Sequence, residues 1–209
     1  MEDFILRNWP SNIEEVVLGN KQLRVQLTSI VTSDSDTHIL LVGNAGIGKL
    51  TIATSLIRKE RGVIHYLIEC NEKVMDKVEI NYLNSITKNR LSSFTEKESD
   101  GIFNSIDLFK GDDQQRVADG METIIDLPKK GVLTACALKN VNPDIISQCK
   151  VIHVTPPSNE CWIPRIQQIL VNEGFEELSD NACLSIIRTG KGTAKGILRE
   201  LYLLCERFK

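Results

Sequence analysis

A glycine-rich segment between residues 43 and 49 carries the strongest chemical signal in the sequence. It fits the pattern GxxxxGK, in which backbone N–H groups surround phosphate oxygens and a lysine reaches the terminal phosphates. A helix that begins at the end of this segment would aim its positive end at the same anion. We therefore expect a loop that binds nucleotide phosphates, formed by Gly43, Asn44, Ala45, Gly46, Ile47, Gly48 and Lys49.

The residue after the lysine departs from this pattern. Position 50 should be Ser or Thr, whose hydroxyl binds Mg²⁺, but it is Leu50. Thr51 comes next, and one residue along a helix is a rotation of about 100°, so its hydroxyl should point elsewhere. Leu50 and Thr51 still belong to the expected binding segment. The sequence predicts nucleotide binding through the loop backbone and Lys49, with poor placement of Mg²⁺ and no protein metal site.

Apolar runs alternate with helical stretches along the first three quarters of the chain. Residues 37–42 form a near-continuous apolar run that ends in glycine, which is typical of a buried parallel strand. The following residues, 49–60, have a helical pattern. Further strands are expected at 63–69, 131–136 and 150–154, and further helices at 12–31, 74–92 and 112–127. This alternation predicts an α/β fold with a parallel sheet flanked by helices.

The pattern changes at Pro156 and Pro157. Everything after this pair has helical periodicity, over about 159–173, 179–189 and 193–208. A double proline disfavours helix at the residue before it and suits a short, stiff linker. We therefore divide the chain into a nucleotide-binding domain, residues 1–157, and a small domain of three helices, residues 158–209.

Composition excludes several broad classes. The chain has 209 residues, 42% hydrophobic and 25% charged, which is ordinary for a globular protein and excludes a low-complexity chain. The net charge of −3 gives no overall basic field for nucleic acid. The six cysteines are spread singly without a CxxC pair, which argues against a zinc site and favours reduced thiols in an intracellular protein. No apolar run is long enough to span a membrane.

Several short segments outside the loop follow one another in a recognisable order. They are Arg7–Pro10, Val17–Lys21, Ile68–Glu72, Ser147–Cys149 and Gly192–Lys195. With the glycine-rich loop, this order resembles the small subunits of DNA sliding-clamp loaders of the replication factor C type, in the AAA+ superfamily. The resemblance covers nearly the whole chain. It implies a P-loop AAA+ fold followed by a helical lid.

The resemblance also implies ligands and partners. The cofactor would be ATP or ADP, with Trp9 and Pro10 either beside the adenine or simply anchoring the N-terminal segment. The partners would be other clamp-loader subunits in a hetero-oligomer, the sliding clamp and, through the complex, the DNA backbone. Such a protein acts in DNA replication or repair, in the nucleus if the organism is eukaryotic.

Every catalytic position of that family is altered in this sequence. The Walker B strand matches Ile102–Asp107, so Asn104 and Ser105 replace the two acids that hold metal-bound water and activate the attacking water. The sensor-1 position falls on Cys136 and the arginine-finger position on Gln148. Sensor 2 becomes Lys195, which keeps the charge but loses the bidentate fork.

These departures together predict a degenerate subunit that does not hydrolyse ATP and binds nucleotide weakly or not at all. The chain ends at Lys209, where members of that family continue into a helical collar domain. Two other functions remain open. One is an active P-loop ATPase of helicase-loader type, with Asp107 or Asp112 holding the metal; the other is a free-standing pseudo-ATPase adaptor.

Overall fold

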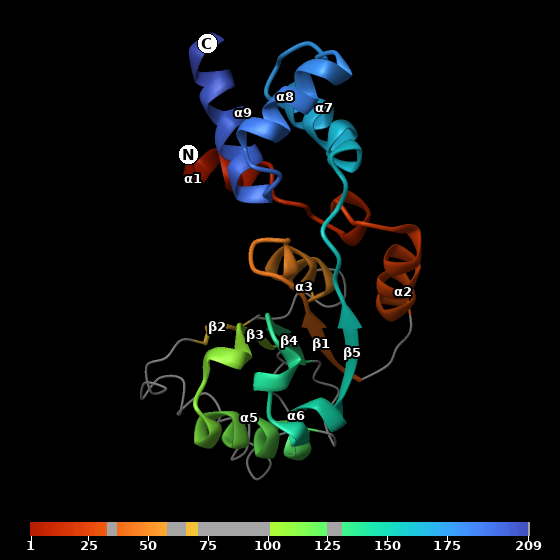
Figure 1. The fold of residues 1–209 in the computed structure, drawn as a ribbon, viewed down its shortest axis with the longest axis vertical. Coiled ribbons are helices and arrows are strands. Elements are labelled where there is room, and N and C mark those ends of the chain that lie inside the picture. Colours follow the sequence, from red (N-terminus) through yellow and green to blue (C-terminus); the bar gives the residue numbers. More distant parts are fainter. Residues whose placement is uncertain (33–36, 58–65, 71–100, 125–130, 209) are drawn as a thin grey trace, which may run out of the picture.

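The computed structural model describes residues 1–32, 37–57, 66–70, 101–124 and 131–208 (Figure 1). The helix expected over 74–92 lies outside these residues. Within them, no helix combines the length and apolar character needed to cross a membrane.

Five strands of the described chain form one parallel sheet in the order β2–β3–β4–β1–β5. The strands are β1 (His38–Val42), β2 (Tyr66–Glu69), β3 (Gly101–Asn104), β4 (Gly131–Ala135) and β5 (Cys149–His153). The strand β1 lies between β4 and β5, and its Leu40 pairs with Leu133 on one side and with Val151 on the other. The α/β class and the parallel sheet expected from the sequence are therefore confirmed.

Helices cover both faces of the sheet because successive residues of a strand point to opposite faces. Ile39 and Leu41 of β1 pack into one core with helices α2 (Lys21–Thr32) and α3 (Lys49–Ile57). Leu40 and Val42 pack into the opposite core with α5 (Gly111–Ile124) and α6 (Pro143–Gln148). Figure 1 shows α3 on one side of the sheet and α5 and α6 on the other.

The continuous helix expected over residues 12–31 is wrong. The structure has a short 3₁₀ helix, η1 (Ile13–Glu15), then an extended stretch, then α2. A Cβ at Gly19 would lie 2.8 Å from the carbonyl oxygens of Thr155 and Pro156, so this stretch packs tightly on the chain that leaves β5. The side chain of Asn20 accepts a hydrogen bond from the Leu23 N–H at 2.6 Å, and this N-cap starts α2 afresh.

Three helices follow the sheet and have a core of their own. We call residues 158–208 the helical unit; it contains η4 (Asn159–Trp162), α7 (Ile163–Asn172), α8 (Asp180–Thr189) and α9 (Ala194–Phe208). Apolar side chains of all three helices, such as Ile166, Ile187 and Leu201, are fully buried together. Two further 3₁₀ helices, η2 (Ile106–Leu108) and η3 (Leu138–Asn140), lie between sheet elements.

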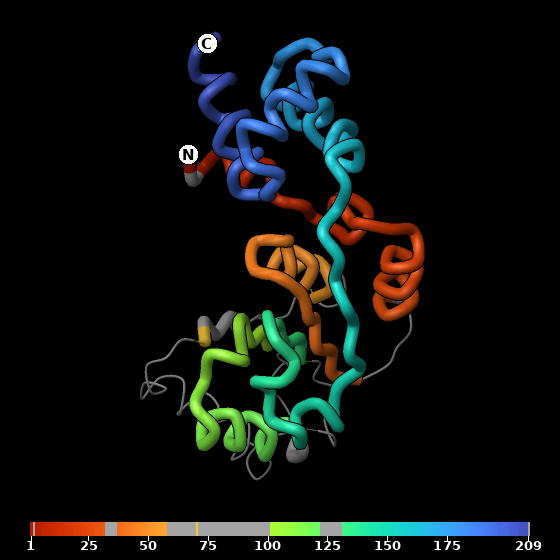
Figure 2. The backbone as a smooth tube through the Cα atoms, in the orientation of Figure 1, coloured from red at the N-terminus to blue at the C-terminus, as the bar shows by residue number. Residues whose placement is uncertain are grey.

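A short first helix, α1 (Glu2–Arg7), joins the helical unit instead of the sheet. Phe4 is 3% exposed and belongs to the core of the helical unit. Its ring meets that of Tyr202 on α9 edge to face, with centroids 5.7 Å apart. Figure 2 shows the N-terminal chain passing along the helical unit before it reaches α2. Residues far apart in the sequence therefore build one core.

Replacement of Phe4 by Ala tests this shared core. Truncating a buried phenylalanine costs about 3–5 kcal/mol, so we expect Phe4→Ala to lower the free energy of unfolding by about 3 kcal/mol in chemical denaturation. Leu6 lies on the same helix and is 69% exposed, and Leu6→Ala should change it by less than about 0.5 kcal/mol. Equal effects of the two variants would contradict the packing of α1.

Candidate functional site

The glycine-rich segment connects the buried strand β1 to helix α3, as the sequence predicts. Gly46 and Gly48 have φ angles of 79° and 93°, which side-chain-bearing residues rarely adopt. No atom lies within 4 Å of where a Cβ would stand on either residue, so the space beside them is open. The backbone of the loop is therefore not covered by other atoms beside these two glycines, and phosphate binding needs such access to the backbone N–H groups.

Lys49 is turned into this loop. Its side chain is buried, with 7% of the residue exposed. The Nζ donates to the carbonyl oxygens of Gly43 at 2.6 Å and Asn44 at 2.8 Å, and lies 3.6 Å from the Sγ of Cys136. The ammonium is thus positioned at the loop, and phosphate oxygens would replace some of these partners when they bind.

Leu50 and Thr51 begin α3 without offering a metal ligand in the usual place. Leu50 is half-buried and packs against the core between α2 and the sheet. Thr51 lines a cavity together with Ile47 and Gly48 of the loop. Within the described residues, no group of three or more His, Cys, Asp or Glu side chains is placed to hold a metal ion.

Asn104 and Ser105 stand at the end of β3, next to β4. The Thr134 hydroxyl donates to Asn104 Oδ1 at 2.7 Å and accepts from the Ser105 N–H at 2.8 Å. Ser105 itself has a positive φ of 63°. The two residues expected in place of acidic ones are therefore joined to the neighbouring strand through one threonine.

Asp107 has a partner that the sequence does not reveal. Its Oδ2 accepts hydrogen bonds from the N–H groups of Cys136 at 2.9 Å and Ala137 at 3.1 Å, just beyond the end of β4. Its Oδ1 is buried with no hydrogen-bond partner. Because Cys136 also contacts Lys49, Asp107 fixes the segment that faces the phosphate loop.

Gln148 and Lys195 are not brought to the loop. Gln148 ends α6, and its amide donates to the Ala118 carbonyl of α5 at 3.2 Å, so the side chain is bound within its own chain. Lys195 is exposed on the first turn of α9. The residues of α9 that line the cavity near the loop are Ala194 and Leu198, one turn apart.

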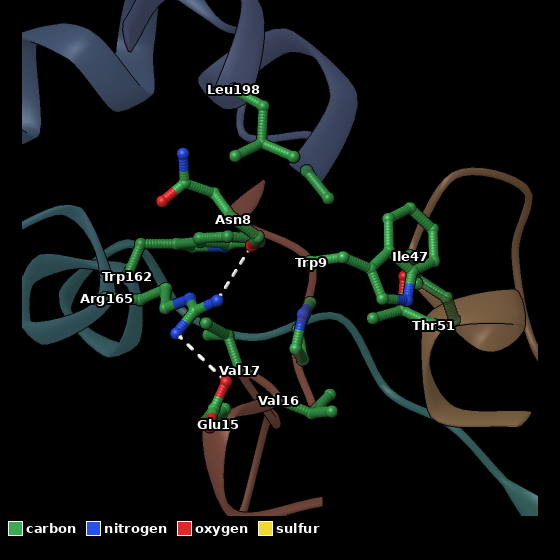
Figure 3. Close-up of a pocket in the computed structure, with 13 residues that line it drawn as sticks. Asn8, Trp9, Glu15, Val16, Val17, Ile47, Thr51, Trp162, Arg165 and Leu198 are labelled. Carbon is green, nitrogen blue, oxygen red and sulfur yellow. Dashed lines mark hydrogen bonds and ion pairs between the residues drawn. The ribbon is translucent and has the colours of Figure 1, made fainter. Parts of the chain in front are cut away.

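A cavity of about 50 Å³ lies between the N-terminal segment, the start of α3 and the helical unit. It is lined by Asn8, Trp9, Pro10, Glu15, Val16, Val17, Ile47, Gly48, Thr51, Trp162, Arg165, Ala194 and Leu198 (Figure 3). Sites for small molecules usually measure about 300–1,000 Å³. The cavity is therefore nearly closed and has room only for a few water molecules.

Trp9 closes one wall of this cavity. Figure 3 shows its indole beside Ile47 and Thr51. Its Nε1 donates to the Thr54 hydroxyl at 3.2 Å, which holds the ring on α3. Trp9 thus anchors the N-terminal segment to the helix that follows the phosphate loop.

Arg165 is a cavity residue that the sequence analysis missed. It is almost fully buried and donates to the Asn8 carbonyl at 2.8 Å and to the Gln168 side chain at 2.7 Å, and it lies 3.5 Å from Glu15 (Figure 3). Burial lowers the pKa of Arg165 from its ordinary value, and the carboxylate of Glu15 opposes this shift. An arginine stays protonated under these conditions, so it is a buried cation that joins the helical unit to the N-terminal segment.

A second contact of the same kind lies nearby. Arg7 donates to both carboxylate oxygens of Glu173, at 3.0 and 3.3 Å, and the amide of Asn8 donates to Glu173 at 2.8 Å. Asn8, which lines the cavity, is thereby bonded to the helical unit through Glu173.

Comparison with known proteins gives weak but consistent sequence similarity. No family model matches the chain. It is 25% identical over 207 residues to replication factor C small subunit 1 of Pyrobaculum arsenaticum, covering 96% of this chain and 61% of that protein. It is also 25% identical over 197 residues to a replication factor C small subunit of Methanoculleus marisnigri. The chain spans about three fifths of the length of these relatives.

Solved structures provide the decisive comparison for the fold. The Holliday junction branch migration motor RuvB of Thermotoga maritima superimposes with a TM-score of 0.70 and 16% identity, covering 92% of this chain and 63% of that one. The chain has the AAA+ P-loop fold. At this identity the likeness concerns the fold alone, and function has to be argued from the site.

Thiol alkylation can test whether the AAA+ phosphate loop takes a nucleotide. Cys136 and Cys161 are exposed, and both should be alkylated at pH 8. Burial raises the pKa of Cys149 to about 12, so its thiol stays protonated and should remain unlabelled. Because Cys136 lies against Lys49, we expect ATP to slow the labelling of Cys136 at least several-fold, as measured by peptide mass spectrometry.

Cys161 is the internal control of this experiment because it lies outside the loop, on η4. Its labelling should change much less with ATP than the labelling of Cys136. An equal rate of Cys136 labelling with and without saturating ATP would show that phosphates do not occupy the loop.

Proposed function

We propose that this protein is a nucleotide-binding, non-hydrolysing subunit of a DNA sliding-clamp loader. The observation that carries the proposal is the contrast between the carboxyl ends of two strands of the same sheet, β1 and β3. The loop after β1 has the open glycines and the inward lysine of a phosphate site, whereas β3 ends in Asn104 and Ser105 bound to Thr134.

The phosphate loop supports binding of ATP or ADP. Backbone N–H groups between Gly43 and Lys49 would hold the phosphates, and the positive end of α3 favours the same negative charge. Lys49 would contribute a point charge. Leu50 packs into the core and has no hydroxyl, so this loop does not fit the usual Mg²⁺ site.

The catalytic positions argue against hydrolysis. Asn104 cannot orient a metal-bound water by charge, and Ser105 is too weak a base for an attacking water. Gln148 is bound to α5 and offers no cation to a neighbouring subunit. Loss of an arginine finger costs about 10³–10⁵ in rate in other phosphoryl-transfer enzymes.

The clamp-loader role rests on the relatives. They bear the name replication factor C small subunit, and the chain aligns with about three fifths of their length. We infer that the helical unit acts as the lid of the AAA+ module, with the domain boundary after Pro157. The partners would be other loader subunits, a ring-shaped clamp and the DNA that the assembled loader surrounds.

An active ATPase of another type would need a carboxylate near the phosphate loop. Asp112 is exposed on the first turn of α5. Asp107 lies closer, since it binds the backbone of Cys136, but one of its oxygens is already used by two N–H groups. These contacts favour a structural role for Asp107.

Restoring the missing hydroxyl should change the metal dependence of binding. We expect the affinity of the unmodified protein for ATP to differ less than about twofold with and without Mg²⁺ in calorimetric titrations. Leu50→Thr should make Mg²⁺ raise the affinity about tenfold, or about 1.4 kcal/mol. Lys49→Ala should weaken binding in both conditions.

Thr51→Val is the matched control for this titration, because it removes the one hydroxyl next to position 50. Its affinity for ATP, with and without Mg²⁺, should match that of the unmodified protein. A strong Mg²⁺ dependence that Thr51→Val abolishes would mean that Thr51 takes over the metal, and our account of Leu50 would fail.

Hydrolysis is tested separately. We expect no Mg²⁺-dependent phosphate release above background from the isolated chain. Turnover that disappears in Lys49→Ala would overturn the non-hydrolysing assignment. If Asp107→Asn then also abolished turnover, the active-ATPase alternative would be favoured. A chain that captures no clamp-loader subunit in pull-down experiments would favour a free-standing adaptor.

A further inference from the structure

The indole N–H of Trp162 is a buried donor without a partner. Trp162 is 9% exposed, and its Nε1 is buried and makes no hydrogen bond. The residue lines the cavity beside the phosphate loop. Buried donors are nearly always paired, and an unpaired one destabilises the protein until a ligand or water supplies an acceptor.

The other tryptophan of the chain shows the contrast. Trp9 lines the same cavity, but its N–H is already bound to the Thr54 hydroxyl at 3.2 Å. Arg165 is held by the Asn8 carbonyl and by Gln168. Of the N–H groups of Trp9, Arg165 and Trp162, the indole N–H of Trp162 is therefore the one that a ligand could still pair with.

The position of the cavity indicates the chemistry of that ligand. Its lining includes Gly48 and Thr51, so it opens beside the last turn of the phosphate loop. A molecule with its phosphates in the loop would place its other end here. Most of the lining is apolar, including both indoles, Val16, Val17 and Leu198, which suits the faces of a flat aromatic ring.

We propose that Trp162 reads the nucleobase, donating its indole N–H to a ring-nitrogen or carbonyl acceptor on the base edge. This role rests on the proposed nucleotide binding and adds a specificity-determining residue to it. The cavity of about 50 Å³ has to widen for the base, and pairing of the Trp162 N–H is part of what favours the wider state.

Two probes and two variants separate the base from the phosphates. The probes are ATP and inorganic tripolyphosphate, which has the phosphates without a base, and binding is measured by calorimetry. Trp162→Phe removes the N–H and keeps an aromatic ring. We expect it to weaken ATP binding about tenfold, to leave tripolyphosphate binding within about twofold, and not to lower the midpoint of thermal unfolding without ligand.

Trp9→Phe is the matched control, since it makes the same change in the same cavity at an N–H that already has a partner. It should lower the ratio of ATP affinity to tripolyphosphate affinity clearly less than Trp162→Phe does, because the N–H that it removes already has the Thr54 hydroxyl as its partner. A similar loss of this ratio in both variants would mean that ring size, and not the Trp162 N–H, is what the base senses.

Each remaining outcome decides the inference. An unchanged ATP affinity in Trp162→Phe would show that water satisfies the N–H, and an equal loss for both probes would show a purely structural role. Either result overturns the proposal for Trp162 while the phosphate site stands. If the unmodified protein binds neither probe, the proposed nucleotide binding fails and the reading of the base fails with it.

Discussion

The pairing of β1 between β4 and β5 is the constraint on which the rest of the structure depends. All three strands are parallel, so their carboxyl ends meet at one edge of the sheet. This edge brings together the phosphate loop after β1, Cys136 after β4 and the linker after β5. The strand β1 is buried along its whole length, which holds the loop on a rigid base. Residues from separate parts of the sequence meet at this edge because the sheet places the ends of its strands side by side.

Cys136 shows how these positions depend on one another. Its N–H is held by Asp107, and its Sγ lies against the ammonium of Lys49. Cys136 thus links Asp107 to the phosphate loop, through its backbone N–H on one side and its weakly polar thiol on the other. Asn104 and Ser105 are both bonded to the Thr134 hydroxyl, so the ends of β3 and β4 are connected through one side chain.

The sequence was sufficient for the sheet and the phosphate loop, because both depend on local pattern. The apolar run before Gly43 and the glycines before Lys49 predicted strand, loop and helix in the right order. The sequence did not predict the contacts between residues that are far apart in the chain. The helix α1 has no side-chain cap and exists against α9, more than 190 residues away in the chain. Arg165 could have been suspected, since it lies on the buried face of α7 with Ile166 and Ile169, but its partner Asn8 could not.

Because α1 packs in the helical unit, two segments of the chain connect this unit to the part of the protein that contains the sheet. One runs from α1 to η1, and the other from β5 to η4. They are fastened to each other near the sheet, where Gly19 packs on the Pro156 carbonyl and Asn20 bonds to Thr155 at 3.3 Å. Two connections constrain the position of the helical unit more than a single linker would. The cavity wall that contains Trp162 is therefore positioned relative to Trp9 by both segments and by the Arg165–Asn8 hydrogen bond between them.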